Sequence, residues 1–394
     1  MDVKPDSNPN PWRVPLSDVQ VDEELLGAVH RTVASGWWSM GPTVEAFERA
    51  FADFCGCAHA LAVSSGTAAL HLALLAVGAG PGDEVILPSL NFVAAANSAI
   101  HTGATPVFCD IRGHEDLNLD PADLEAAVTP RSRIILALHY GGFPCDMDAV
   151  NDVASRHGLE VVEDAAHAPG AAVAGHMCGT LGRVGCFSFF SNKNLPVGEG
   201  GVVVTDDAGL AERMRLLRSH GMTTLTWDRH RGHAHSYDVV VNGFNYRLDE
   251  VRAAVGLVQL ERLKAGNAAR ARLVARYRML LDGVDGLTMP FAGANETSAH
   301  HLAVVILPHG VTRSGVQESM RRRGIQTSVH YPPIHRFSAY AEAAGARREL
   351  PETDDVAERV LTLPLYPHLQ DDQVDDVAQA LHEALATEAP SRVS

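Results

Sequence analysis

The sequence has little positive charge. Its 394 residues carry 48 Asp plus Glu against 32 Lys plus Arg, so the formal net charge is -16. Non-specific nucleic-acid binding and binding to anionic membranes both reward a basic surface, and the composition argues against either function. We therefore expect no nucleic-acid partner and no membrane partner. An anionic substrate would need a local basic pocket.

Long apolar runs are also missing. No stretch is long enough to span a bilayer, and the N-terminal segment MDVKPDSNPNPWRVPL lacks the apolar core of a signal peptide. These two features predict a cytoplasmic protein.

The six cysteines and twenty histidines form no recognisable metal motif. Cys55 and Cys57 have the wrong spacing for a zinc knuckle, and neither an HExxH nor a CxxC ligand set occurs. The group His230, His233 and His235 is more typical of a polar loop than of a metal site. We expect buried thiols and no metal centre.

Lysine is scarce. Only Lys4, Lys193 and Lys264 occur, so arginine supplies almost all of the positive charge. Arginine stays protonated in proteins, whereas lysine can lose its proton and form a Schiff base with a carbonyl group. Lys4 lies in a proline-bearing N-terminal segment and Lys264 in a charged helical pattern. Lys193, in a loop between the apolar run 186–190 and a glycine-rich segment, is the candidate for a reactive amine, although a loop-capping role is the simpler alternative.

Apolar segments alternate with helical patterns from residue 61 to residue 217, after two helical patterns at 21–33 and 44–54. Alternating strands and helices indicate a mostly parallel sheet with helices on both faces. Ligands bind at the carboxyl ends of such strands, where Ser65, Phe92, Asp164 and Lys193 would meet. The predicted strands are 61–63, 85–87, 105–108, 134–138, 159–162 and 202–204, and the later helices are 92–100, 147–157 and 208–217.

The C-terminal third has a different pattern. A long amphipathic helix is predicted at 249–281, followed by strands at 302–307 and 326–330 and helices at 316–323 and 373–385. Strands and helices arranged in this way favour a separate α+β unit. We expect an N-terminal arm (1–20), a large domain (21–248), a linking helix (249–285) and a small C-terminal domain (286–394).

Two segments carry polar residues suited to a cofactor. Ser65-Gly66-Thr67 follows a strand and opens a helix, where N–H groups, a hydroxyl and the helix dipole favour a phosphate. Glu163 and Asp164 end an apolar strand, and Asp164 could keep the ring nitrogen of a pyridine protonated. Taken singly, the first segment is also a common helix cap and the second a common strand ending.

Taken together, the motifs resemble those of the DegT/DnrJ/StrS aminotransferases, from about residue 21 to about residue 379. That family consists of pyridoxal 5'-phosphate (PLP) enzymes of fold type I, so the resemblance implies an α/β fold with a large domain and a smaller α+β domain. The matching motifs are Ser65-Gly66-Thr67, Pro88–Phe92, Glu163–His167, Ser188 with Lys193 five residues on, Gly198–Gly201 and Asn242–Arg247.

The resemblance implies catalytic roles for three residues. Lys193 would form the Schiff base, Asp164 would pair with the pyridinium nitrogen, and His167 would lie near the ring 3-hydroxyl. Many family members carry Gln at the position of His167. Phe92 would stack on the ring, and Asn91 stands where Thr is common.

The resemblance also implies how the phosphate is held. Ser65, Gly66, Thr67 and Ser188 would surround it within one chain. Asn245 would reach the phosphate of a partner subunit, which implies a homodimer with shared active sites. A helix-entry role for Asn245 is the alternative.

Substrate contacts are implied at the entrance and in the small domain. Aromatic side chains can stack on a sugar or base, and polar groups can bond its hydroxyls. Packing and turn formation are the alternative roles. The candidates are Trp37, Trp38, His330 and Tyr331 for the sugar or base, and Arg247 and the loop 229–231 for a diphosphate.

The implied reaction moves an amino group in two stages. An amino donor, expected to be L-glutamate, converts PLP into pyridoxamine 5'-phosphate (PMP), and a nucleotide-linked keto-deoxysugar then takes the nitrogen. The Lys193 amine would move protons in both stages, so the site must lower its pKa from about 10.4.

Four functions stay open. The leading one is amination of a nucleotide sugar for a natural product or a surface glycan, and the second is amination of a keto-cyclitol in aminoglycoside assembly. A PMP-dependent sugar dehydratase is disfavoured because those relatives carry His in place of the lysine. A non-catalytic regulator is disfavoured by the presence of both Lys193 and Asp164.

Overall fold

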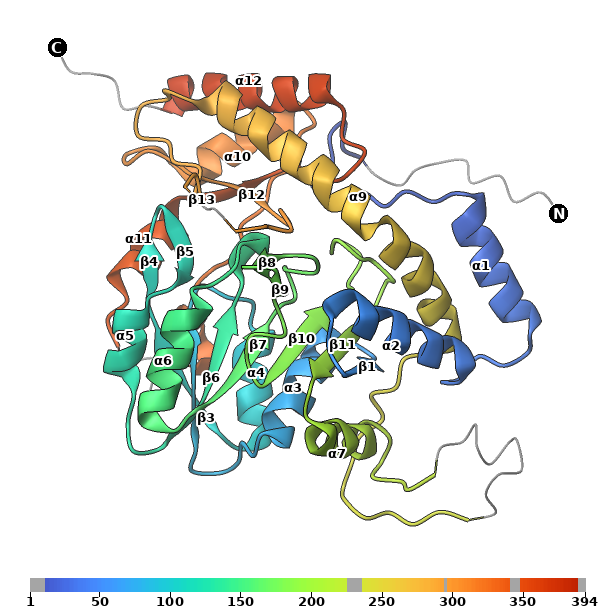
Figure 1. Cartoon of the computed structure of the whole chain (residues 1–394). Helices are drawn as coiled ribbons and strands as arrows, with labels where there is room; N and C mark the ends of the chain where they lie inside the picture. Colours follow the sequence, from blue (N-terminus) through green and yellow to red (C-terminus); the bar gives the residue numbers. More distant parts are fainter. Residues whose placement is uncertain (1–10, 225–235, 294–295, 341–347, 389–394) are drawn as a thin grey trace.

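A seven-stranded sheet forms the centre of the computed structural model, which describes residues 11–224, 236–293, 296–340 and 348–388 (Figure 1). The strand β11 runs antiparallel to both of its neighbours, and the remaining strands are parallel to one another. The predicted mostly parallel sheet is therefore confirmed. Its strands lie in the order β1 (His59–Val63), β11 (Gly201–Thr205), β10 (Val184–Ser188), β7 (Glu160–Asp164), β6 (Ser132–Leu138), β2 (Glu84–Pro88) and β3 (Thr105–Cys109).

Helices cover both faces of this sheet because successive strand residues point to opposite sides. Leu136 and Val162 pack on one face, whereas their neighbours Ile135 and Val161 pack on the other. The first face is covered by α3 (Gly66–Ala76), α4 (Ala94–Thr102) and α7 (Ala208–Arg218), and the second by α2 (Pro42–Cys55), α5 (Pro121–Ala127), α6 (Met147–His157) and part of α9 (Glu250–Leu281).

The long helix α9 runs from the sheet to a second layer, drawn above the sheet in Figure 1. There it packs with α10 (Arg313–Arg322), α12 (Asp371–Glu388) and the antiparallel pair β12 (Ala303–Ile306) and β13 (Val360–Leu363) around one apolar core. Val14, close to the N-terminus of the described chain, is fully buried in the same core and bonds to Gly324.

Side-chain caps define several helix starts. The side chains of Ser65, Asp146 and Asp249 accept backbone N–H groups at the starts of α3, α6 and α9. Glu250 acts at a distance, because its buried carboxylate accepts the N–H groups of Gly41, Thr43 and Val44 at the start of α2.

The strand predicted at 326–330 is wrong. This segment forms only an isolated bridge between Ser328 and Thr362, and the chain after it bonds to Ser89 near the end of β2 through the N–H of Ile334. The sequence patterns also missed several short elements, which depend on local turns rather than on long periodic stretches. The missed elements are β4 (Ile111–Gly113), β5 (Asp116–Leu119), α5, β8 (Ala172–Val173), β9 (His176–Met177), α11 (Pro351–Arg359) and β13. The helix α1 (Glu23–Ala34) corresponds to the helix predicted at 21–33.

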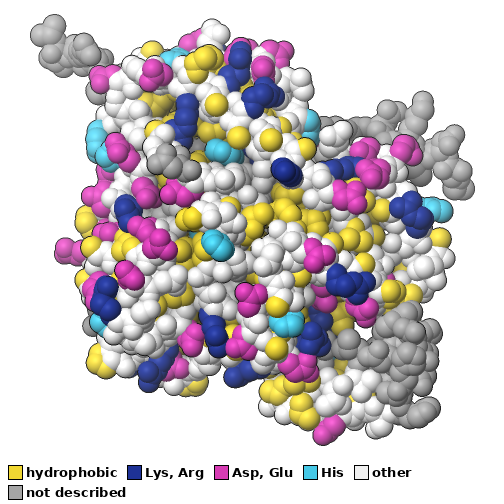
Figure 2. Space-filling model, in the orientation of Figure 1, with side chains coloured by type: hydrophobic (Ala, Val, Ile, Leu, Met, Phe, Trp, Pro, Cys, Tyr) yellow, Lys and Arg dark blue, Asp and Glu magenta, His cyan; other side chains and the backbone are white. Residues whose placement is uncertain are grey.

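On the part of the surface coloured by residue type in Figure 2, acidic and basic side chains are interspersed. Among the described residues, no helix is both long enough and apolar enough to cross a membrane.

Candidate active site

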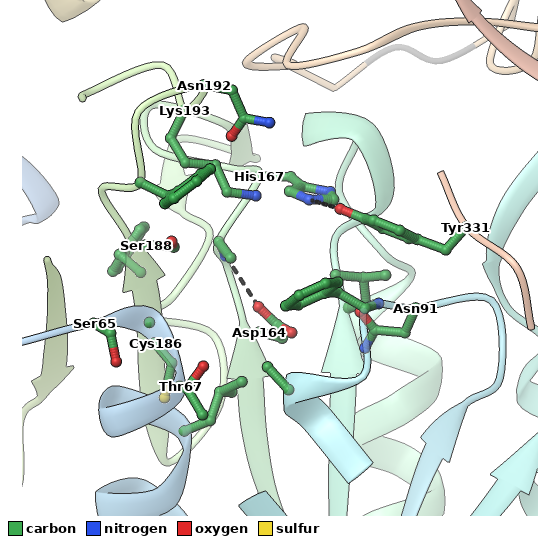
Figure 3. A pocket seen from close by; sticks show the side chains of 18 of the residues that line it. Ser65, Thr67, Asn91, Asp164, His167, Cys186, Ser188, Asn192, Lys193 and Tyr331 are labelled. Carbon is green, nitrogen blue, oxygen red and sulfur yellow. Dashed lines mark hydrogen bonds between the residues drawn. The ribbon is translucent and has the colours of Figure 1, made fainter. Parts of the chain in front are cut away.

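A pocket of about 410 Å³ opens where β1, β2, β6, β7 and β10 end. Parallel strands end at one edge, so the loops that follow them converge there (Figure 3). The pocket brings together every cofactor-binding residue predicted from the sequence except Asn245. Those on its wall are Ser65, Gly66, Thr67, Phe92, Asp164, His167, Ser188 and Lys193.

Asp164 is the acid at the floor of this pocket. It is buried at the end of β7, and its Oδ1 accepts the N–H of Ala166 at 3.2 Å. Burial raises the pKa of Asp164, whereas the Ala166 N–H and the amine of Lys193 act in the opposite direction. A cationic partner would therefore stabilise the ionised carboxylate.

Glu163, the other acid of the pair, has a structural role. Its fully buried carboxylate accepts the N–H groups of Gly179, Leu181 and Gly182 at 2.6–2.7 Å. His139 completes the set through Nε2 at 2.9 Å. Since Nδ1 of His139 accepts the N–H of Cys145, the ring proton lies on Nε2 and is donated to the carboxylate.

The amine of Lys193 ends inside the pocket, above Asp164 and facing His167 (Figure 3). Burial lowers the pKa of Lys193 to about 8, although the carboxylate of Asp164 opposes this shift. An appreciable fraction of the amine is therefore neutral near physiological pH, as a nucleophile or a proton acceptor requires.

A cradle for an anion lies at the start of α3. The Ser65 hydroxyl caps this 11-residue helix by accepting the N–H of Ala68, and Thr67 faces the pocket. A Cβ atom on Gly66 would lie 2.7 Å from Cβ of Ser188, so glycine alone permits this close approach of helix and strand. Free N–H groups and a helix dipole at such a point favour a phosphate group.

His167 links the pocket wall to Tyr331. The N–H of Gly141 donates to its Nδ1 at 3.3 Å, so its proton lies on Nε2, which donates to the Tyr331 hydroxyl at 2.9 Å. Burial, with the nearby amine of Lys193, lowers the pKa of His167 well below its ordinary value. The ring is therefore neutral, and the hydroxyl proton of Tyr331 can be donated to a ligand.

Of the residues predicted to contact the substrate, the structure places some on the pocket wall and others outside it. His330 and Tyr331 line the pocket, although Nδ1 of His330 lies 2.8 Å from the Thr362 hydroxyl. Trp38, which bonds to Val33, does not line it, and neither does Arg247. Asn245 is exposed and does not line the pocket of its own chain, and the partly buried Trp37 does not line it either. The predicted loop 229–231 and the group His230, His233 and His235 lie outside the described residues.

The wall also contains polar and aromatic residues that had no role assigned from the sequence, among them Asn91, Phe190, Asn192 and Glu199. Three of them lie in the loop that carries Lys193, and nearness to that lysine was the available signal. Asn91 precedes Phe92, whose N–H it binds through Oδ1 at 2.6 Å. Its buried side-chain amide lies near Asp164, where it acts to lower the pKa of that carboxyl.

The wall therefore fits PLP. A ligand with a phosphate, an aromatic ring and an aldehyde finds the cradle at Gly66, an acid at Asp164 and an amine at Lys193. A lysine amine above a buried carboxylate at the carboxyl edge of this sheet suits a PLP-dependent enzyme, and solved aminotransferase structures share this fold, which places the chain among the PLP-dependent aminotransferases.

A family comparison makes the assignment specific. The DegT/DnrJ/EryC1/StrS aminotransferase family matches residues 19–382, so the chain belongs to this family. The predicted family, enzyme class and fold class are thereby confirmed. Enzymes of this family depend on PLP, which is the cofactor of this chain.

Three relatives show the extent of the similarity. The spore coat polysaccharide biosynthesis protein SpsC of Bacillus subtilis is 43% identical over 379 residues, which cover 95% of this chain and 96% of SpsC. The structure of S. venezuelae DesV in complex with a ketimine intermediate is 39% identical, with a TM-score of 0.85 and 94% and 95% of the two chains covered. DesI in the presence of its TDP-sugar product is 33% identical, with a TM-score of 0.86 and 96% and 94% covered.

Proposed function

We propose that the enzyme transfers an amino group from L-glutamate to a nucleotide-linked keto-deoxysugar in the cytoplasm. The observation that carries this proposal is the Lys193 amine, whose pKa is lowered to about 8 in the pocket that also holds Asp164. SpsC, named for polysaccharide biosynthesis, and DesI, solved with a TDP-sugar product, support the sugar class.

When bound, PLP supplies a carbonyl that links to amines and a ring that withdraws electrons from the bond that breaks. Lys193 would hold that carbonyl and, once released, carry a proton between two carbon atoms of the reacting ligand. Asp164 would keep the ring nitrogen protonated. Phe92 would stack on the ring, and His167 would lie beside its 3-oxygen.

Phosphate binding would fall to the start of α3. Ser65, Gly66 and Thr67 offer N–H groups and hydroxyls there, and Ser188 adds a hydroxyl from the neighbouring strand. Tyr331 and His330, on the opposite wall, would contact the sugar, because the Tyr331 hydroxyl has a proton to donate.

We also propose a homodimer with shared active sites. Phe92 and Phe190 at the pocket expose 55% and 45% of their surface, and Val240 exposes 56%. Apolar side chains exposed near a pocket favour a partner surface. Asn245, exposed and outside its own pocket, would reach the phosphate in the partner's pocket, with Arg247 and Trp38 near the substrate.

An absorbance experiment tests the transfer. The purified enzyme loaded with PLP should show a band for the lysine-linked cofactor, and L-glutamate should replace it with the band of PMP. Lys193→Ala should lack the linked band. If the loaded wild-type enzyme shows no response to any amino acid, the proposed function is wrong. A panel of keto-sugars with and without a nucleotide, together with keto-cyclitols, then identifies the acceptor.

Mixing variants tests the shared site. Lys193→Ala and Asn245→Ala homodimers should each be impaired, whereas their mixture should regain activity because one site of each mixed dimer has both residues. No regain in verified mixed dimers would contradict the sharing of Asn245 between chains.

A further inference from the structure

Asn194, the residue that follows Lys193, uses both polar atoms of its side chain in hydrogen bonds. Nδ2 of Asn194 donates to the carbonyl of Ala299 at 2.7 Å and to Oδ1 of Asn267 at 2.8 Å. Its Oδ1 lies 3.0 Å from Nδ1 of His301. One amide thus joins the lysine loop to α9 and to the segment 298–302, which leads into β12.

The donors and acceptors of this network are determined by its geometry. Since Nδ2 of Asn194 faces two oxygen atoms, Oδ1 is the acceptor and Nδ1 of His301 must carry the ring proton. Asn267 is oriented in the same way, because its Nδ2 donates to the carbonyl of Pro169 at 2.8 Å. Burial and the charge of Lys193 lower the pKa of His301 well below its ordinary value, so the ring stays neutral.

The segment 298–302 is itself held firmly. Ala299 donates its N–H to the carbonyl of Gly142 at 2.9 Å, and His301 donates its N–H to that of Gly141 at 2.8 Å. The Ser298 hydroxyl adds a bond of 2.8 Å to Gly142. The His301 ring also lies 4.5 Å from the ring of His167. The same segment therefore touches both the lysine loop and the histidine of the opposite wall.

We propose that Asn194 and His301 are positioning residues, which tie the lysine loop to the segment 298–302 and thereby fix the Lys193 amine relative to Asp164 and His167. A misplacement of about 1 Å at a reacting group can reduce a rate by about a hundredfold. This inference rests on the proposed role of Lys193, but its test begins with the protein free of cofactor.

The small number of lysines makes a direct test possible. Competitive labelling with acetic anhydride across a pH series, read by mass spectrometry, reports the titration of each amine. Exposed Lys264 serves as the internal reference. In Asn194→Ala the loop is released and water reaches the amine, so the Lys193 titration should move upward from near 8 toward about 10.4. Lys264 should not change.

Two substitutions of His301 separate positioning from packing. An asparagine at position 301 places its side-chain NH₂ group where Nδ1 of the histidine ring lies. A glutamine there places its NH₂ group near the position of Nε2 instead. His301→Asn should therefore keep the labelling profile and the rate at which PLP links to Lys193. His301→Gln should shift the profile and slow the linkage at least about tenfold.

Ser298→Ala is the matched control. It removes two hydrogen bonds of the Ser298 hydroxyl, one to Gly142 and one from the N–H of His300, without touching Asn194. The backbone bonds of Ala299 and His301 remain, so it should lower stability and leave the Lys193 profile unchanged. Profiles identical to wild type in Asn194→Ala and His301→Gln would overturn the inference. If Asn194→Ala does not fold, the His301 pair decides. A wild-type Lys193 that titrates near 8 but never links PLP would refute the proposed function and leave the positioning test intact.

Discussion

Glu163 and Asp164 are neighbours in the sequence, yet their carboxylates lie on opposite sides of β7. Asp164 faces the pocket, whereas Glu163 is enclosed by three backbone N–H groups and His139. The twofold alternation of a strand produces this separation. Asp164 is therefore available to a ligand in the pocket, whereas Glu163 stabilises the fold.

Substituting the two acids should give opposite phenotypes. Asp164→Asn removes a carboxylate whose burial already raises its pKa, so the melting temperature should change little while PLP affinity and turnover fall at least about a hundredfold. Glu163→Gln puts an NH₂ group among donors and should cost about 3–5 kcal/mol of unfolding free energy. Thermal unfolding and PLP titration of both variants check this. Equal loss of stability in the two would contradict the division of roles.

The linkage of PLP to cofactor-free enzyme should depend on pH through Lys193. Burial lowers the pKa of this amine to about 8, and only the neutral form attacks a carbonyl. The rate should therefore rise with pH up to about 8 and then level off. In Asp164→Asn the opposing carboxylate charge is gone, so the midpoint should move to lower pH. Stopped-flow absorbance measures both profiles, and an upward shift in Asp164→Asn would refute this electrostatic relation.

Gly66→Ala should damage the phosphate cradle. The added Cβ would lie 2.7 Å from Cβ of Ser188, so helix and strand must separate at a cost of about 1–3 kcal/mol. Affinity for PLP should fall with the stability. Gly27→Ala in α1 is the control, because its Cβ meets only the flexible end of Arg31 and should be neutral or slightly stabilising. Calorimetry and PLP fluorescence titration distinguish the two, and unchanged PLP affinity in Gly66→Ala would argue against the cradle.

Tyr331→Phe should reduce turnover by about ten- to a hundredfold, because it removes a hydroxyl from the pocket and leaves Nε2–H of His167 without its acceptor. Tyr340→Phe removes a comparable bond, from Tyr340 to Asn97 at 2.6 Å, outside the pocket wall. Each change should cost about 1–3 kcal/mol of stability, but only the first should lower kcat. Similar kcat values for both variants would exclude a contact between Tyr331 and substrate.

Periodic segments of the sequence predicted most of the fold. The helix at Met147–His157 was predicted with its observed limits, and the predicted strand 134–138 lies within β6. Such segments bury one regular face, which leaves a repeating pattern of apolar residues. The segment 326–330 failed because it contacts β13 through one bridge only, a relationship that no local pattern records.

By itself, the sequence determined the alternation of strands and helices and, through the scarcity of lysine, singled out Lys193 as the candidate for a reactive amine. Only the tertiary structure decided which acid faces that amine and that Asn194 is tied to His301, 107 residues away. Local preferences act over a few residues, whereas side-chain partners and burial are set by segments that meet only when the chain has folded.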